Sequence, residues 1–149
     1  MPTATHRLAR PTLLAVGLFA GGAFAQGLTS EPAPEGTSVR IISPSDGDTV
    51  PAEFTVVFGL SGMGIAPAGV DQDGTAHHHL LVDTDQIPAQ DQPMGNPPLH
   101  FGGGQTETVL TLEPGEHTLQ LVLGNYLHVP HSPPIVSEQI TVTVEPDGN

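Results

Sequence analysis

The sequence predicts an all-β fold, an immunoglobulin-like antiparallel β-sandwich of about seven strands. Apolar and polar residues alternate with a period of two through several short segments, and turn-forming residues separate these segments. After the first 25 residues, no segment shows the apolar stripe of an amphipathic helix. A cupin-like barrel is the alternative fold, because it is also built from many short strands.

Six segments have the composition and the alternation of strands. In the segment 53–60 the apolar residues occupy every second position, and QITVTV at 139–144 alternates in the same way. Proline, glycine, aspartate and serine cluster between the segments, as expected of turns. The expected strands lie at 38–42, 53–60, 77–82, 106–112, 116–123 and 139–144.

Two long loops interrupt these strands. Ser61–Ala76 and Thr84–Gln105 are rich in glycine and proline, and each adjoins a segment that contains histidine. Loops of this length in a compact domain are usually functional. A binding site is therefore expected beside them.

The N-terminus has the order of a secretory signal peptide. A short basic segment precedes an apolar run, and Ala23-Phe24-Ala25 fits an A-x-A cleavage site. The run is too short for a transmembrane helix, which needs about 20 residues, so no membrane span is expected after cleavage. Residues 1–25 are predicted to be the signal peptide, 26–37 a flexible leader and 38–146 a single domain, exported to the periplasm or the extracellular space.

The charge of the expected mature chain restricts its partners. Arg40 is the one basic residue left against 16 carboxylates, and the formal charge of −13 becomes −15 because Arg7 and Arg10 are removed. No basic surface for nucleic acid is available. The chain has no cysteine, so a transition metal would have to be held by histidine, carboxylate, methionine or backbone groups.

Seven histidines remain in the mature chain, and they fall in four short segments. In a strand, His77 and His79 point to one face with their Cα atoms about 6.6 Å apart, whereas His78 faces the other way. His78 is expected to face solvent or to pack on a loop. The strand that begins at His117 places this residue on the inward face, with the leucines that follow it.

The favoured hypothesis is a metal site. Its expected ligands are His77, His79, His117 and His128, with His131 or His100 as a further ligand. Imidazole suits copper and zinc. A thioether from Met63 or Met94, in the two long loops, would favour copper, although methionine is also a common gap filler.

Three stretches carry a resemblance to a known family. HHHLLVDT, LHFGGGQTETVLTLEPGEHTLQLVLGN and HVPHSPPIVSEQITVTV resemble the secreted bacterial family called domain of unknown function 4399, from about Gly69 to Val144. The resemblance implies export and this fold, and it implies that the histidine segments are family features. It implies no established activity.

The sequence leaves three functions open. The first is a metal-binding accessory protein that is not a catalyst, and the second is a structural or interaction module of the cell envelope. The third is a cupin-like metal-dependent oxygenase, since His77-His78-His79 with Pro114-Gly115-Glu116-His117 resembles the two cupin motifs. That resemblance is incomplete, because the usual glutamate after H-x-H is missing and the second motif is too short.

Overall fold

The computed structural model describes residue 28 and residues 30–146. This part of the chain contains nine strands and no α-helix. Three strands have only two residues, and the other six coincide with the six expected segments to within two residues at either end. The strands are β1 (Ser38–Ser43), β2 (Thr49–Val50), β3 (Glu53–Ser61), β4 (Gly64–Ile65), β5 (Thr75–Val82), β6 (Leu99–His100), β7 (Glu107–Thr111), β8 (Gly115–Gly124) and β9 (Ile140–Val144).

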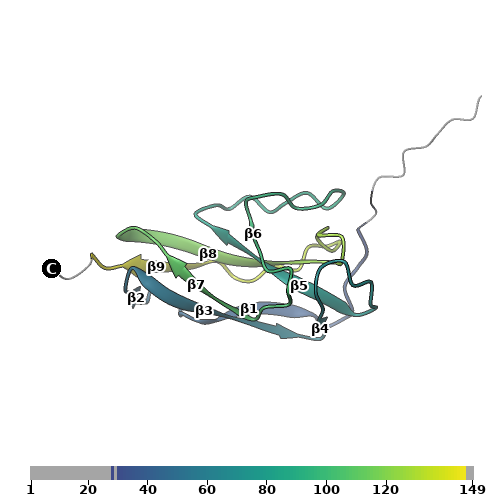
Figure 1. The fold of residues 1–149 in the computed structure, drawn as a ribbon, viewed down its shortest axis with the longest axis horizontal. Helices are drawn as coiled ribbons and strands as arrows, with labels where there is room; N and C mark the ends of the chain where they lie inside the picture. The colour runs from purple at the N-terminus through teal and green to yellow at the C-terminus, as the bar shows by residue number, and fades with distance from the viewer. Residues whose placement is uncertain (1–27, 29, 147–149) are drawn as a thin grey trace, which may run out of the picture.

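Two sheets form the sandwich (Figure 1). The smaller sheet has the order β1-β3-β7 and is antiparallel. The larger sheet has the order β2-β9-β8-β5-β4, with β6 paired to β5. Its long strands β5, β8 and β9 are antiparallel, and the short strands β2 and β4 run parallel to their neighbours.

The core lies between the two sheets and follows the alternation of the sequence. Phe54, Val56 and Phe58 of β3 are buried against Leu119, Leu121 and Leu123 of β8 in a single apolar cluster. Complete burial stabilises the fold by about 1.5–3 kcal/mol for each such side chain. The immunoglobulin-like β-sandwich is therefore confirmed, and the barrel alternative is wrong because the sheets remain two separate layers.

Strand β5 is buried on both faces. All six residues from Ala76 to Leu81 are buried, although only alternate ones point between the sheets. Figure 1 shows the segment between β5 and β6 on the side of the larger sheet that faces away from β1 and β3. This segment covers part of the outer face, and here the structure differs from a sandwich with two solvent-exposed outer faces.

The described part of the leader is attached to the domain. Ser30 Oγ donates a hydrogen bond to the carbonyl of Pro130, and the carbonyl of Glu31 accepts one of 3.1 Å from the amide of Ser132. From Ser30 onward the leader therefore has partners in the chain after β8, and its flexibility stays a prediction. The predicted signal peptide lies outside the described residues.

Within the part of the chain that the structure covers, no helix is long and apolar enough to cross a bilayer.

Candidate metal centre

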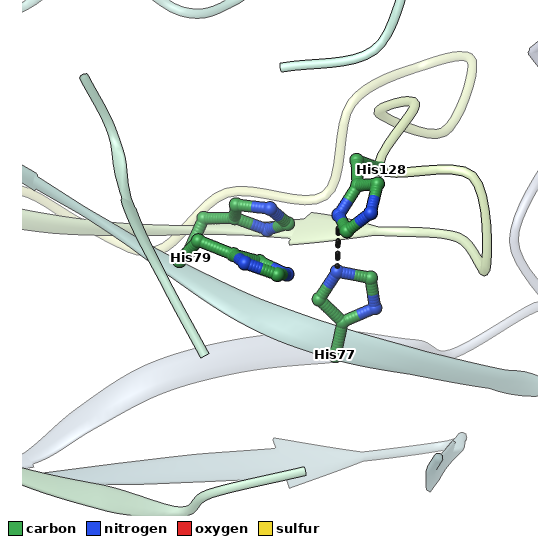
Figure 2. Close-up of side chains that lie close together, drawn as sticks. His77, His79 and His128 are labelled. Atoms are coloured by element: carbon green, nitrogen blue, oxygen red, sulfur yellow. Dashed lines mark hydrogen bonds between the residues drawn. The ribbon is translucent and has the colours of Figure 1, made fainter. Parts of the chain in front are cut away.

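Four histidine side chains meet on the outer face of the larger sheet. His77 and His79 come from β5, His100 from β6, and His128 from the turn after β8. Each ring offers one nitrogen atom, and these four atoms all lie within 4.8 Å of one another. Figure 2 shows His77 and His128 facing each other beside His79. We call this set the four-histidine cluster.

The alternation of β5 accounts for the first two members. His77 and His79 project from one face, and their ring centroids are 4.8 Å apart. They are 0 % and 1 % exposed. The sequence-based prediction that these two rings share a face is confirmed by their shared place in the cluster.

Strand pairing brings in the third member. His100 is the direct partner of His79 in the antiparallel pair of β6 with β5, so both side chains lie on the same face. Their rings stack with centroids 5.0 Å apart. A Cβ atom on Gly102 would lie 2.2 Å from Cε1 of His100, so a larger residue there would displace the His100 ring from this position.

A tight turn presents the fourth member. His128 has a φ of 64°, in the left-handed region that few non-glycine residues adopt. Asn125 holds the turn, because its Oδ1 accepts hydrogen bonds from the amides of Leu127 and Val129 at 2.9 and 3.0 Å. The result is a distance of 3.2 Å between Nδ1 of His128 and Nε2 of His77, the dashed line in Figure 2.

Buried ring nitrogens without partners are concentrated in the cluster, where His79 has no hydrogen bond at either nitrogen, whereas His78 and His131 outside it each lack a partner only at Nε2. Nδ1 of His77 and both ring nitrogens of His79 are buried and form no hydrogen bond. A buried polar atom without a partner costs about 1–3 kcal/mol. Coordination of a metal ion would satisfy the nitrogen of each ring that carries no proton.

The environment also keeps the rings neutral, as metal ligation requires. Burial and the nearby His128 and His100 lower the pKa of His77 from 6.5 to about 4. Burial and the other rings, His77 first, lower the pKa of His79 to about 2. Burial followed by the proximity of His128 also lowers the pKa of His100. These pKa values fall first because burial removes water from the charged ring, and second because neighbouring protonated rings repel one another.

The dimensions fit a four-coordinate ion after a small contraction. A tetrahedral zinc site with Zn–N bonds of about 2.0–2.1 Å separates its ligand nitrogens by about 3.3 Å. The ring nitrogens of the cluster lie within 4.8 Å of one another, so ring movements on the order of 1 Å would bring them to the tetrahedral distance. Copper has similar requirements for imidazole ligands.

His78 lies between the sheets, on the opposite side of β5 from the cluster. It pairs with Leu123 across the strands and packs against the ring of Phe58, with centroids 5.1 Å apart. Its Nδ1 is 3.3 Å from the carbonyl oxygen of Gln105. The expected opposite orientation is confirmed. Of the two expected surroundings, solvent exposure is wrong because His78 is buried between the sheets, whereas its contact with Gln105 is with the end of the expected loop 84–105.

His117 is not brought to the cluster, contrary to the sequence-based hypothesis. Strand β8 is antiparallel to β5, so its last residue, Gly124, lies beside His77, whereas its first residues lie near Asp83. Nδ1 of His117 is 2.8 Å from Oδ2 of Asp83, and Nε2 is 2.8 Å from the carbonyl oxygen of Glu113. Both oxygens can only accept hydrogen bonds, so both contacts are hydrogen bonds only when both nitrogens carry a proton, and the arrangement favours the protonated ring.

The hydrogen bond that His117 donates to the carboxylate of Asp83 raises the pKa of His117, as does the bond to the carbonyl oxygen of Glu113. The stabilisation that the protonated His117 gives to the fold is therefore complete below pH 6.5 and lost as the pH rises through the raised pKa.

We expect Asp83→Asn to return the pKa of His117 toward 6.5, because an amide carries no charge. Asparagine also tolerates the φ of 54° at this position. Titration of the His117 ring by NMR checks this, and an unchanged pKa would contradict it.

His131 is also separate from the cluster. It is buried, and its Nδ1 lies 3.2 Å from the carbonyl oxygen of Glu31 in the leader. His128 and His131 were both expected ligands, but only His128 belongs to the cluster. Pro130 forms a bridge with Gly124 at the edge of β8, and the chain then turns His131 toward the leader.

Fold and site together define a β-sandwich protein with a four-histidine cluster on an outer face. The chain belongs to the family described as Domain of unknown function (DUF4399), whose sequence profile matches residues 56–145. All four cluster histidines and both long loops fall inside the match. The resemblance found in the sequence is thereby confirmed.

One solved structure and no curated protein accompany this family match. The structure is described as "Structures of Clostridium thermocellum CbhA fibronectin(III)-like modules", and it is 14 % identical with a TM-score of 0.36. The alignment covers 73 % of this chain and 45 % of that chain, so this protein spans less than half of its length. No curated protein matches the sequence.

Proposed function

We propose that this protein is an exported metal-binding accessory protein, which holds one copper or zinc ion in the four-histidine cluster. The observation that carries the proposal is the convergence of four ring nitrogens within 4.8 Å, two of the rings being fully buried. A polar edge of a core would bond at least one nitrogen of each ring to a backbone group, as in His78 and His131, whereas neither nitrogen of His79 has a partner.

The donor set determines the class of metal. All four donors are imidazoles, and no carboxylate belongs to the cluster. Calcium and magnesium prefer oxygen ligands, whereas zinc and copper accept imidazole readily. The large negative charge of the chain would raise the local concentration of any cation before it reaches the site.

The number of donors favours binding over catalysis. Catalytic zinc sites keep three protein ligands and leave a position open for water or substrate, whereas closed sites use four. The four-histidine cluster supplies four. The chain's own chemistry is therefore to bind, orient and shield the ion, and the oxygenase alternative receives no support from His117, which is engaged with Asp83.

One measurement tests the proposal on untagged protein recovered from the exported fraction without chelator. Mass spectrometry of the native protein is expected to show one copper or zinc ion per chain. The mass of the denatured protein should equal that of a chain that begins at Gln26. The first expectation follows from the cluster and the second from the A-x-A site at Ala23–Ala25. Protein that carries no ion and takes up neither metal would instead support the structural-module hypothesis. A denatured mass equal to that of the chain from Met1 would refute cleavage of the signal peptide.

A further inference from the structure

We propose that Met94 supplies a thioether ligand to the four-histidine cluster, which makes this a copper site able to hold Cu(I). The inference rests on the proposed function, since it names the metal of the same site. It goes beyond the histidines because Met94 comes from the covering segment between β5 and β6, which contributes no other residue to the cluster.

The backbone of Met94 is attached to the turn that carries His128. The amide of Met94 donates a hydrogen bond of 2.8 Å to the carbonyl oxygen of His128. The two residues are 34 positions apart in the sequence, so this bond fixes the covering segment at the cluster. The bond keeps the backbone of Met94 next to the turn that carries one of the four rings.

The side chain of Met94 points inward. A Cβ atom added to Gly124 would lie 2.7 Å from the terminal methyl carbon of Met94 and 2.7 Å from Cε1 of His79. The methionine methyl and the buried ring of His79 thus lie over the same glycine. Along 89–97, every residue except Met94 is exposed, so this side chain alone is withdrawn from solvent.

The chemistry of a thioether selects the metal. Methionine sulfur is a soft donor that favours Cu(I), whereas zinc is well satisfied by imidazole alone. A site with four imidazoles and one thioether can bind Cu(I) through the sulfur and only some of the rings. The same site can hold Cu(II) mainly through the rings.

The test compares Met94→Leu with the unaltered full-length protein. Leucine is similar in volume and apolar, so the substitution removes the sulfur while retaining the packing. We expect the affinity for Cu(I) to fall by about 10-fold or more, on the scale that follows loss of a group supporting a metal site. The affinities for Cu(II) and Zn(II) should change less than about threefold, since the four rings remain.

Met63→Leu is the matched control. Met63 lies in the other long loop, beside the apolar core and the cavity lined by the leader, and does not belong to the cluster. We expect this variant to bind all three ions as the unaltered protein does. X-ray absorption of the Cu(I) forms should show a sulfur neighbour in the unaltered protein and in Met63→Leu, but not in Met94→Leu.

The outcomes separate the two proposals. If the unaltered protein binds no metal, the proposed function fails and this inference fails with it. If it binds zinc or Cu(II) while Met94→Leu retains its Cu(I) affinity, and only nitrogen neighbours are seen, the metal site stands. Met94 is then a packing residue of the covering segment, and the copper assignment is overturned.

Discussion

Replacement of His79 by alanine is expected to weaken the affinities for Cu(II) and Zn(II) by about 100-fold or more. His79 is a buried ring, flanked by His77 and stacked on His100. Loss of a mere supporting partner commonly costs 10–100-fold in metal affinity, and a direct ligand should cost at least as much. His100→Ala should also weaken binding, and because His100 is exposed, that variant leaves the core intact.

Two control substitutions give this prediction its contrast. His117→Ala removes a histidine that is bonded to Asp83 outside the cluster, so metal affinity should stay within about threefold. His78→Ala opens a cavity against Phe58 and should destabilise the fold by about 2–5 kcal/mol. The folded fraction should nevertheless bind metal normally. Competition titration gives the affinities, and urea unfolding gives the free energies of unfolding.

The pattern of the four variants decides the assignment. Weak binding by His79→Ala and His100→Ala, with normal binding by His117→Ala, would support the cluster as the site. Loss of binding in His117→Ala alone would move the site to the other end of β8. If all four variants had the affinity of the unaltered protein, the four-histidine cluster would be refuted as the metal site.

The metal-free protein is expected to lose about 3 kcal/mol or more of its free energy of unfolding between pH 7 and pH 4.5. In the folded state the pKa values of His77 and His79 are about 4 and about 2, whereas an unfolded histidine titrates near 6.5. The unfolded chain therefore binds more protons below pH 6.5, and stability falls with pH. One pKa unit corresponds to about 1.4 kcal/mol, and the coupling of the rings reduces the sum.

Urea unfolding at the two pH values measures this loss, and His79→Leu is the control. Leucine fills the buried position without a titratable group, so part of the acid sensitivity should disappear. At pH 7, saturation with metal at about 100 times the dissociation constant should add about 2.7 kcal/mol to the unaltered protein. Equal losses on acidification in the unaltered protein and in His79→Leu would show that the cluster is not the acid-sensitive group.

The lowered pKa values also determine how metal binding depends on pH. An unperturbed site would lose its ion as the pH falls through about 6.5. Because the pKa of His77 is about 4 and that of His79 is lower still, protons compete with the metal at these two rings only at more acidic pH. Titration of the metal affinity at pH 7.5, 6 and 5 checks this. His77 and His79 should remain ligands at all three pH values.

Much of the fold was predictable because its information is local. Period-two alternation in 53–60 and 139–144 is a property of neighbouring residues, and it correctly predicted strands β3 and β9 and their buried faces. The opposite orientation of His78 and His79 follows from the same alternation. The two-residue strands β4 and β6 were missed, since their pairing with β5 depends on that strand and not on their own residues.

The sequence by itself determined a β-sandwich rich in turns, with His77 and His79 on one face of a strand. Only the tertiary structure decided which other histidines join them. Antiparallel pairing carries the start of β8 away from His77 and its end toward it, which excludes His117 and brings the turn with His128 into place. The register of β6 sets His100 opposite His79. Pairing partner and register depend on contacts between distant segments, and alternation within one segment contains no information about them.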